Sequence, residues 1–492
     1  INNIRQGGKS QGGSTITQQV AKGLLLSPEK TYLRKFKEAI LAWRIDRMLT
    51  KDEIIYIYLN HIYLGEGAYG VEAAALTYFD KHAAELNLGE IAVLAGLPQA
   101  PSRYSPIDHW DKAHTRQRYV LNRMAADGYI SESEAKVAHN IIPKLNRSDH
   151  RQGANGYYLQ VVRKRAEKMI GGSLKKAGLK IYTNLDQRAQ LEGQLAVRTG
   201  VTAVAARNGG GKGSPEAALV ALDGCSGRVR ALIGGTDFAT TQFNRAVQAK
   251  RPAGSVFKPL VYSTALEKGW ATDTIILDEP LSIKGADGKS WQPKNFSGKN
   301  YGKVSLSRAL IYSYNIPAVK TMQKTGVKPV HQLARRAGIS AELPPDLSLA
   351  LGAVDVSPLE MSAAYQPFVC KGAYTLPTLI HSISTHDGET IYRHKPKQTA
   401  VMSSGSALRM KSMLQEVINR GTGKKAGGVP GTIGGKTGTS DENRDAWFIG
   451  FQNQRITGVW VGHDRNQSLG RSENGGRTAA PIWRDYMTRT GG

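Results

Sequence analysis

Residues 251–259 read Arg-Pro-Ala-Gly-Ser-Val-Phe-Lys-Pro, a short segment that places a serine three residues before a lysine. On a helix, residues three apart lie on one face, so the amine of Lys258 can lie against the hydroxyl of Ser255. Burial favours the neutral amine, which can then remove the proton of that hydroxyl. Gly254 permits a tight turn, and the apolar residues that follow predict a helix anchored in a core. The segment therefore predicts Ser255 as a nucleophile and Lys258 as its base.

Two further clusters follow Ser255 along the chain. Residues 312–315 read Tyr-Ser-Tyr-Asn, and residues 434–440 read Gly-Gly-Lys-Thr-Gly-Thr-Ser. Ser-x-x-Lys, Ser-x-Asn and Lys-Thr-Gly are together the motifs of class A β-lactamases and penicillin-binding proteins. A second Lys-Thr-Gly, at 324–326, follows a predicted helix and has no predicted strand beside it. The copy at 436–438, which leads into strands, is therefore the candidate for the site.

Each residue type in these motifs suits one step of acyl transfer. Ser255 is predicted to attack an acyl carbonyl and become an ester, with the backbone amides of Ser255 and Thr439 holding the oxyanion. Ser313 can relay a proton between Lys258 and a leaving amine. Gly438 would let the substrate lie close against the strand edge. Donors for the amide and the carboxylate of the substrate are predicted at Asn315, Lys436, Thr437 and Thr439.

The size and charge of the chain limit the classes of protein to consider. Its 492 residues are too many for one ordinary core and predict two or three domains. The 66 basic residues outnumber the 40 acidic ones, giving a net charge of +26 that indicates an anionic partner. No groove-reading or base-stacking motif for nucleic acid is recognisable, whereas an anionic membrane or a pyrophosphate-bearing lipid accounts for the charge. The two cysteines cannot make a disulfide framework, lack metal-site spacing and leave the compartment undecided.

The first 140 residues are predicted to be helical. Ser-Pro at 27–28 is typical of a helix start, and apolar residues at helical spacing follow it. Four polar residues at offsets that make them neighbours on this helix are Lys30, Arg34, Lys37 and Glu38. A cationic stripe with one carboxylate suits a phosphorylated substrate, although the residues alone favour a solvated face with helix ion pairs.

Longer blocks in the same region resemble a known family. They read Gly-Gly-Ser-Thr-Ile-Thr-Gln-Gln at 12–19, Arg-Lys-x-x-Glu-Ala at 34–39, and Lys-Asp-Glu-Ile-Ile-x-x-Tyr-Leu-Asn followed by Tyr-Leu-Gly at 51–65. These blocks are similar to those of the bacterial peptidoglycan glycosyltransferases. With the three acyl-transfer motifs in this order, nearly the whole chain resembles the class A, bifunctional penicillin-binding proteins.

The resemblance implies a multidomain fold. It implies an all-α, lysozyme-like glycosyltransferase domain at 1–140, a short α/β linker at 141–215 and an α/β penicillin-binding transpeptidase domain at 216–492, whose five-stranded antiparallel sheet is flanked by helices. The first domain would lie on the membrane and polymerise lipid II, with a possible divalent metal, Mg²⁺ or Mn²⁺, at its site. By motif, Glu38 matches the second catalytic carboxylate of the family. The positions that contact the pyrophosphate and donor chain are matched by Gln19, Lys22, Lys30 and Lys37.

One element of the family pattern has no match. The family places its principal glutamate, in a block resembling Glu-Asp-x-x-Phe, well before the Gly-Gly-Ser-Thr segment. The eleven residues before Gly12 include no acidic residue, and no run of eighteen apolar residues occurs in the chain. Because the sequence begins with Ile1 rather than Met, we expect this glutamate and a membrane span in a preceding segment. Without that glutamate, the polymerase function would be lost.

The region after the linker is predicted to combine strands and helices. Apolar runs joined by short polar turns predict two β-hairpins, at 217–223 with 228–234 and at 446–451 with 456–461. The last of these strands is expected to close the sheet. Helices predicted at 306–322 and 357–365 would hold Ser313 and Asn315 near the Ser255 helix. The tail from 465 to 492 is expected to be basic and loop-rich.

The leading hypothesis is a peptidoglycan synthase at the bacterial inner membrane, with its catalytic domains on the periplasmic, extracytoplasmic side. Ser255 would attack the penultimate D-alanine carbonyl of a stem peptide, and β-lactams would inhibit it. Expected partners are lipid II, peptidoglycan strands, the membrane, and possible cell-wall regulators or a second copy, but no nucleic acid. Two alternatives stay open: a DD-carboxypeptidase or β-lactamase that uses water as acceptor, and a non-catalytic, basic polymer-binding scaffold. A class A β-lactamase deacylates with a glutamate, which we cannot place here.

Overall fold

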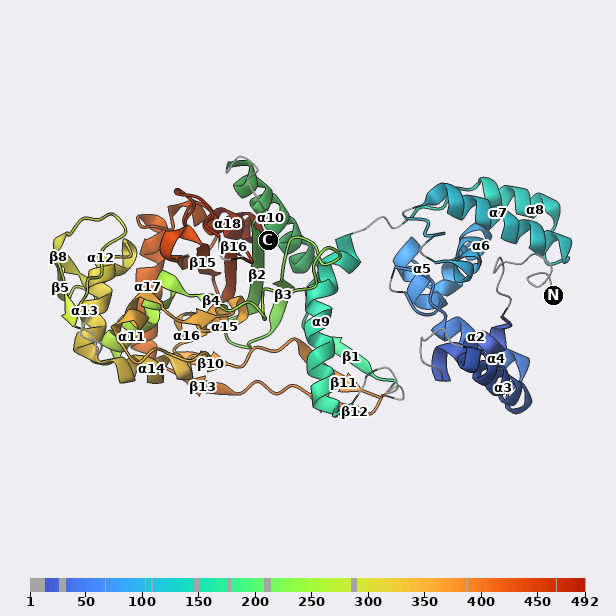
Figure 1. Cartoon of the computed structure of the whole chain (residues 1–492), viewed down its shortest axis with the longest axis horizontal. Coiled ribbons are helices and arrows are strands. Elements are labelled where there is room, and N and C mark those ends of the chain that lie inside the picture. The colour runs from blue at the N-terminus through green and yellow to red at the C-terminus, as the bar shows by residue number, and fades with distance from the viewer. Residues whose placement is uncertain are drawn as a thin grey trace. The chain divides into compact units, whose positions relative to one another are not determined.

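The chain folds into two compact units, Ile1–Gln152 and Gly153–Gly492 (Figure 1). The computed structural model describes residues 14–25, 32–66, 68–101, 103–107, 109–145, 150–172, 174, 178–207, 214–284, 290–385, 388–465 and 467–491. The predicted helix start at 27–28 and the predicted ligand Lys30 lie outside these residues. No helix in the described part combines the length and apolar character needed to cross a membrane.

The first unit is helical, as predicted. Its helices are α2 Ile16–Leu25, α3 Tyr32–Met48, α4 Lys51–His61, α5 Val71–Phe79, α6 Leu88–Gly96, α7 Trp110–Ala126 and α8 Glu132–Asn140. Thr50, Asn87 and Ser131 begin α4, α6 and α8 with capping boxes, which satisfy free amides at the helix starts. The alanine-rich helix α5 buries Ala74 and Ala75, so the helices around it pack closely.

The second unit is organised around a five-stranded antiparallel sheet in the order β14-β15-β16-β2-β3. Its strands are β2 Glu216–Asp223, β3 Val229–Ile233, β14 Ile433–Thr439, β15 Asp445–Gln452 and β16 Arg455–Gly462. Both predicted hairpins are confirmed. The expectation that β16 closes the sheet is wrong, because β16 pairs with β2 as well as with β15 and lies at the centre.

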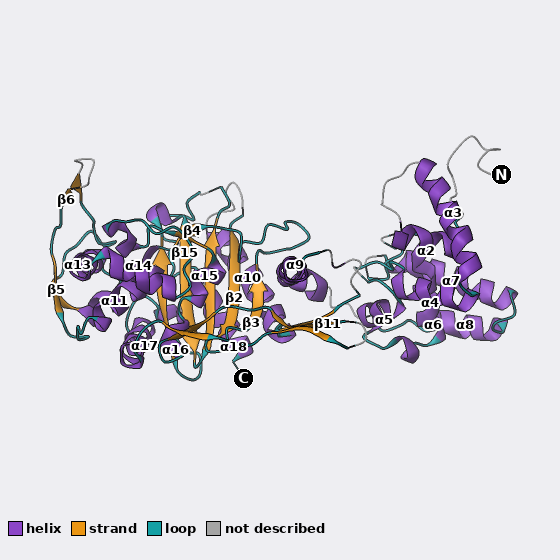
Figure 2. Cartoon of the chain, turned by 90° about the horizontal axis from the view of Figure 1, so that it is seen from below, coloured by secondary structure: helices purple, strands orange, loops and turns teal. Residues whose placement is uncertain are grey.

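Helices cover both faces of this sheet (Figure 2), and successive residues of its strands point into different cores. On β15, Trp447 and Ile449 enter the larger core, while Phe448 enters the smaller one. The larger core packs against α9 His150–Ile170, α11 Lys258–Glu267, α12 Leu306–Ile311, α13 Asn315–Thr325, α14 Val327–Arg336, α15 Pro358–Ala363, α16 Gln366–Val369 and α17 Ser404–Asn419. The smaller core packs against α10 Gln187–Arg207 and α18 Ala479–Thr490.

The tail of the chain ends in a buried helix, so the prediction of a loop-rich tail is wrong for 479–490. Ile482, Trp483 and Tyr486 of α18 repeat at helical spacing and bury their side chains on the sheet. Helix α10, which falls within the predicted linker, lies on the same face. Both helices therefore complete the core of the second unit.

Short strands connect the helices of the second unit. The pairs are β1 Lys180–Thr183 with β11 Ile380–Ser384, β11 with β12 Thr390–Arg393, β10 Ala373–Thr375 with β13 Gln398–Ala400, β4 Arg251–Pro252 with β9 Asp355–Val356, β5 Ile275–Asp278 with β8 Gly302–Ser305, and β6 Ile283–Lys284 with β7 Ser290–Trp291. The β4–β9 pair lies directly before the segment that carries Ser255 and fixes its entry.

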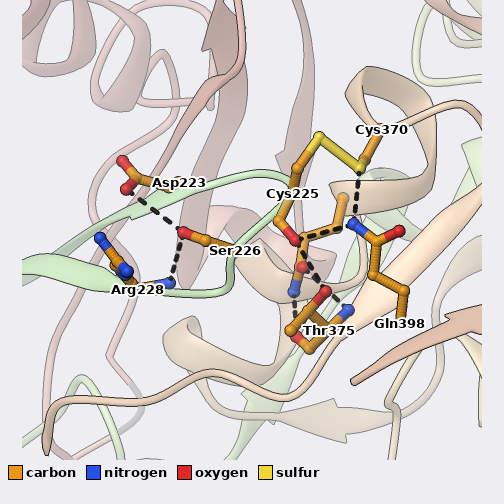
Figure 3. Close-up of a disulfide and its surroundings, with 8 residues drawn as sticks. Asp223, Cys225, Ser226, Arg228, Cys370, Thr375 and Gln398 are labelled. Carbon is orange, nitrogen blue, oxygen red and sulfur yellow. Dashed lines mark hydrogen bonds between the residues drawn. A yellow bond between two sulfur atoms is a disulfide. The ribbon is translucent and has the colours of Figure 1, made fainter. Parts of the chain in front are cut away.

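A disulfide joins Cys225, in the β2–β3 turn, to Cys370, which follows α16 (Figure 3). The carbonyl oxygen of Cys225 accepts hydrogen bonds from Thr375 Oγ1 at 2.8 Å and Gln398 Nε2 at 3.2 Å. Sequence analysis did not find this pair, because two cysteines 145 residues apart carry no spacing signal. The bond ties one end of the sheet to the helical layer.

Replacing Cys370 with serine should lower the free energy of unfolding of the second unit by about 2–4 kcal/mol, because this disulfide closes a long loop. Calorimetric unfolding measures the effect as a lower Tm. Cys225→Ser should give the same loss, the double variant no further loss, and a reductant should affect only the wild type. Equal Tm values for wild type and Cys370→Ser would contradict this prediction.

Candidate active site

Ser255 lies in a 3-10 turn, η4 Gly254–Phe257, which runs directly into α11. In a 3-10 helix, side chains three residues apart are eclipsed, so Ser255 and Lys258 project on one side. The amide of Lys258 donates to the carbonyl of Ser255 and closes this turn. Ser255 is half-buried and Lys258 is fully buried. The local backbone geometry therefore places the side chains of Ser255 and Lys258 on the same side of the turn.

Two glycines allow the segment of Ser255 to approach β14. Gly254 has a φ of +55°, and a Cβ there would lie 2.9 Å from the carbonyl oxygen of Thr439. Gly352 has a φ of +79°, and a Cβ there would lie 2.0 Å from the carbonyl oxygen of Gly254. Only glycine fits such contacts at positive φ. The backbone around Ser255 is therefore held against the end of β14, where the oxyanion amides are predicted.

Four of the predicted residues meet in one hydrogen-bond network. The Nζ of Lys258 donates to the carbonyl oxygen of Ser313 at 2.7 Å and to Asn315 Oδ1 at 2.6 Å, and lies 3.4 Å from Ser313 Oγ. The Nζ of Lys436 donates to the same Oγ at 2.8 Å. The hydroxyl of Ser313 therefore bridges two lysines that come from different elements. A path for a proton between Lys258 and Lys436 is present.

Burial lowers the pKa of both lysines. Burial, followed by the nearby charge of Lys436, lowers the pKa of Lys258 well below its ordinary value. Burial lowers the pKa of Lys436 to about 7. Among the residues that the structure describes, neither amine has a carboxylate partner that would restore its charge. Burial thus favours the neutral amine of Lys258, the form that a general base requires.

Ser313 has a φ of +60°, in the left-handed region that residues with a side chain rarely adopt. Such a conformation costs about 1–3 kcal/mol and persists only where its surroundings impose it. Here the amides of Ser313 and Tyr314 donate to the carbonyls of Leu310 and Ala309, at 3.1 and 2.9 Å. These bonds turn the chain between α12 and α13 and direct the Ser313 hydroxyl to the lysines.

The remaining residues of the Lys-Thr-Gly segment have other neighbours. The hydroxyls of Thr437 and Thr422 lie 2.6 Å apart, and the hydroxyl of Thr439 accepts from the amide of Gly475 at 3.1 Å. A Cβ on Gly438 would lie 2.9 Å from Val256 Cγ1. A glycine is therefore needed at position 438 because β14 packs closely on η4 there. The prediction gave a different reason, the close approach of a substrate.

In the first unit, Glu38 on α3 is buried and pairs with Lys35. The Nζ of Lys35 also donates to Ser14 Oγ at 2.8 Å. Lys37 and Lys22 are exposed, and Gln19 on α2 is half-buried. Glu38 is thus buried while Lys37 is exposed, so the predicted cationic stripe with one carboxylate does not form a single solvent-facing surface of the helix. Sequence analysis missed Lys35, although a lysine three residues before a glutamate is an ion-pair spacing.

No cluster of three or more His, Cys, Asp or Glu side chains in the described ranges could hold a metal ion. The false candidates in the sequence are also accounted for. Lys324 lies in the last turn of α13, followed by Gly326 as its cap. Residues 472–474, Ser-Glu-Asn, also match the Ser-x-Asn pattern, and their Glu473 is buried and bonded to Arg207 at 2.7 Å. Neither joins the network around Ser313.

Comparison with known proteins assigns both units. The transglycosylase family model matches residues 1–125, and the model of the penicillin-binding protein transpeptidase domain matches residues 217–488. Penicillin-binding protein 1A of Aquifex aeolicus is 36% identical to the chain, over 99% of the chain and 77% of that protein. The protein of the same name from Neisseria cinerea is 34% identical, over 99% of the chain and 75% of that protein.

Solved structures give the same result. The crystal structure of penicillin-binding protein 1A from Haemophilus influenzae matches with a TM-score of 0.66 and 26% identity, covering 97% of the chain and 88% of that structure. PonA1 from Mycobacterium tuberculosis, solved in complex with penicillin V, matches with a TM-score of 0.61 and 25% identity, covering 69% of the chain and 93% of that structure.

Replacing Gly352 with alanine should destabilise the second unit by about 1–3 kcal/mol, because the new methyl group meets the backbone of Gly254 at a positive φ. Gly405→Ala is the matched control, since Gly405 lies exposed in the first turn of α17 with open space around its Cβ. Calorimetric Tm values measure both. A Gly352→Ala protein as stable as Gly405→Ala would show that this approach does not constrain the fold.

Proposed function

The chain belongs to the bifunctional penicillin-binding proteins and is a peptidoglycan synthase with a transglycosylase and a transpeptidase domain, and we propose that Ser255 is the nucleophile of its transpeptidase. The observation that carries this proposal is the network in which Lys258 and Lys436 share the Ser313 hydroxyl. A lysine whose pKa is lowered by burial, one turn after a half-buried serine, is the arrangement that activates a hydroxyl.

In the proposed reaction, Lys258 takes the proton of Ser255 Oγ as that oxygen attacks the penultimate D-alanine carbonyl of a stem peptide. The backbone amides of Ser255 and Thr439 hold the oxyanion. The bond to the terminal D-alanine then breaks, and its amine leaves with the proton that Lys258 passes through Ser313. An amine of a neighbouring strand attacks the ester and releases Ser255, so that a cross-link forms.

We propose that the second part of the site holds the peptide. Lys436 supplies the cation for the terminal carboxylate, and the hydroxyls of Thr437 and Thr439 add donors. Asn315 uses its Oδ1 for Lys258, but its Nδ2 has two hydrogens and only one is used by the carbonyl of Lys294, at 2.7 Å. The second hydrogen is left for the substrate amide. Gly438 keeps β14 close to Ser255.

For the transglycosylase we propose Glu38 as the second catalytic carboxylate and Gln19, Lys22, Lys30 and Lys37 as ligands of the pyrophosphate and donor chain. Burial of Glu38 and exposure of Lys22 and Lys37 support separate roles for the carboxylate and the cations. The substrate would be lipid II, and a divalent metal could assist. We propose that residues 1–140 form the polymerase, 141–215 the linker and 216–492 the transpeptidase.

We further propose that the protein works at the bacterial inner membrane with both domains on the extracytoplasmic side. The Cys225–Cys370 disulfide supports this location, since such bonds persist in oxidising compartments. The net charge of +26 suits an anionic membrane and a pyrophosphate-bearing lipid. Partners would be peptidoglycan strands and β-lactams, with cell-wall regulators or a second copy of the chain as further candidates.

Ser255→Ala should abolish covalent labelling by a fluorescent penicillin, because the ester forms on that oxygen. Labelling followed by gel electrophoresis measures it. Ser263→Ala, at a fully buried serine on α11, the helix that follows Ser255, is the control that retains labelling. Labelling of Ser255→Ala at the wild-type rate would overturn the assignment. Rapid release of the label from the wild type would instead favour the hydrolase alternatives.

The second-order rate of penicillin acylation should have a bell-shaped dependence on pH. Below the lowered pKa of Lys258 its amine is protonated, so the rate falls as pH falls. The charge of Lys436 is lost as pH rises through its pKa of about 7, so the rate should fall by about tenfold per pH unit beyond it.

Lys436→Arg tests the alkaline limb, because an arginine keeps its charge throughout the accessible range. Stopped-flow acylation should show that limb in the wild type and not in the variant. An alkaline limb that is unchanged in Lys436→Arg would contradict the role of Lys436.

A further inference from the structure

Asn295, in the loop between β7 and β8, is buried and uses both ends of its side-chain amide. Its Oδ1 accepts from the backbone amide of Asn315 at 2.7 Å and from that of Ile316 at 3.4 Å. Its Nδ2 donates to the carboxylate of Asp278 at 2.8 and 2.9 Å and to the carbonyl of Lys299 at 2.9 Å. This side chain connects a buried carboxylate to the start of α13.

The first turn of α13 depends on Asn295 for its cap. The first amides of a helix have no partner within the helix and need an acceptor from elsewhere. Tyr314, at the N-cap position of α13, makes no side-chain cap bond. The Oδ1 of Asn295 supplies that acceptor from a separate loop. The position of Asn315, the first residue of α13, is therefore set from outside the helix.

The neighbouring residue holds the side chain of Asn315. The carbonyl of Lys294 accepts from Asn315 Nδ2 at 2.7 Å. An amide whose nitrogen is fixed in this way must direct its oxygen to the opposite side, and that oxygen accepts from Lys258 at 2.6 Å. Residues 294–295 thus clamp Asn315 at its main chain and at its side chain.

Asp278, at the end of β5, determines which way the Asn295 amide points. It is buried, and its Oδ2 also accepts from the amide of Tyr301 at 3.0 Å. In the described part of the chain, no cation lies within ion-pair distance of it. Because a carboxylate only accepts, it binds the Nδ2 of Asn295 and leaves Oδ1 for α13. Rotation of the amide would place the Nδ2 donor against the backbone amide of Asn315 and the Oδ1 acceptor against the carboxylate of Asp278.

We propose that Asn295, oriented by Asp278, is a positioning residue for acylation. It fixes the first turn of α13 so that the Asn315 oxygen stays on Lys258 and the Ser313 hydroxyl stays between the two lysines. This inference rests on the proposed function of Ser255. Neither Asn295 nor Asp278 touches the reacting atoms, so both act through Asn315.

An exchange of the two side chains tests the proposal. Asn295→Asp places two carboxylates against each other, and Asp278→Asn replaces one of the two oxygens that face Asn295 Nδ2 with a second donor, so each single variant should lose about 10–100-fold in the rate of penicillin acylation. The double variant Asn295→Asp/Asp278→Asn restores one donor facing one acceptor and should recover at least about tenfold. Asn300→Asp, exposed in the same loop, is the matched control with wild-type acylation.

The pH profile separates positioning from general destabilisation. The Asn315 oxygen favours the charged form of Lys258, so loss of its alignment should move the acid limb of acylation by about half a pH unit to lower pH in the single variants. Acylation of both single variants at the rate of Asn300→Asp would overturn the proposal. The proposal would also be overturned if the acylation rate fell only in proportion to Tm, the acid limb did not move and the double variant did not recover. A wild type that is not acylated would instead refute the proposed function.

Discussion

The chemistry of the candidate active site depends on the burial of two lysines around one serine hydroxyl. Lys258 and Lys436 are both fully buried, and both amines lie within hydrogen-bond distance of Ser313 Oγ. Two cations cannot share such a site without a counter-charge, because desolvation and mutual repulsion both favour deprotonation. The fold therefore lowers the pKa of Lys258, and the neutral amine that this favours is the base in the proposed acyl-transfer site.

The rest of the second unit holds this cluster together. The sheet supplies Lys436 from its edge strand β14, and α11 supplies Lys258 from the layer beneath. These elements approach so closely that a Cβ would not fit at three positions, Gly254, Gly352 and Gly438. The strained turn at Ser313 is held between α12 and α13. The free energy of packing the large core offsets both the strain and the desolvation of the lysines.

Much of this arrangement could be predicted from sequence, because it is encoded in local patterns. The alternating apolar residues of 217–234 and 446–461 identify both hairpins. The ordered motifs predict Ser255, Ser313 and Lys436 as members of one site, and the structure joins Lys436 to Ser313. What sequence could not supply depends on contacts between distant segments. The Cys225–Cys370 pairing, the central place of β16 and the cap from Asn295 all join residues whose separation carries no periodic signal. Gly438 was predicted as a site position, and its close packing on η4 could not be read from the sequence.

The protonation state of Lys258 is the most direct test of this account. In protein labelled with ¹³C at lysine Cε and assigned with Lys258→Met, the Lys258 resonance should titrate well below the ordinary lysine value of about 10.4. A Lys258 resonance that titrates near the ordinary value would mean that the buried amine is charged, and would contradict the account.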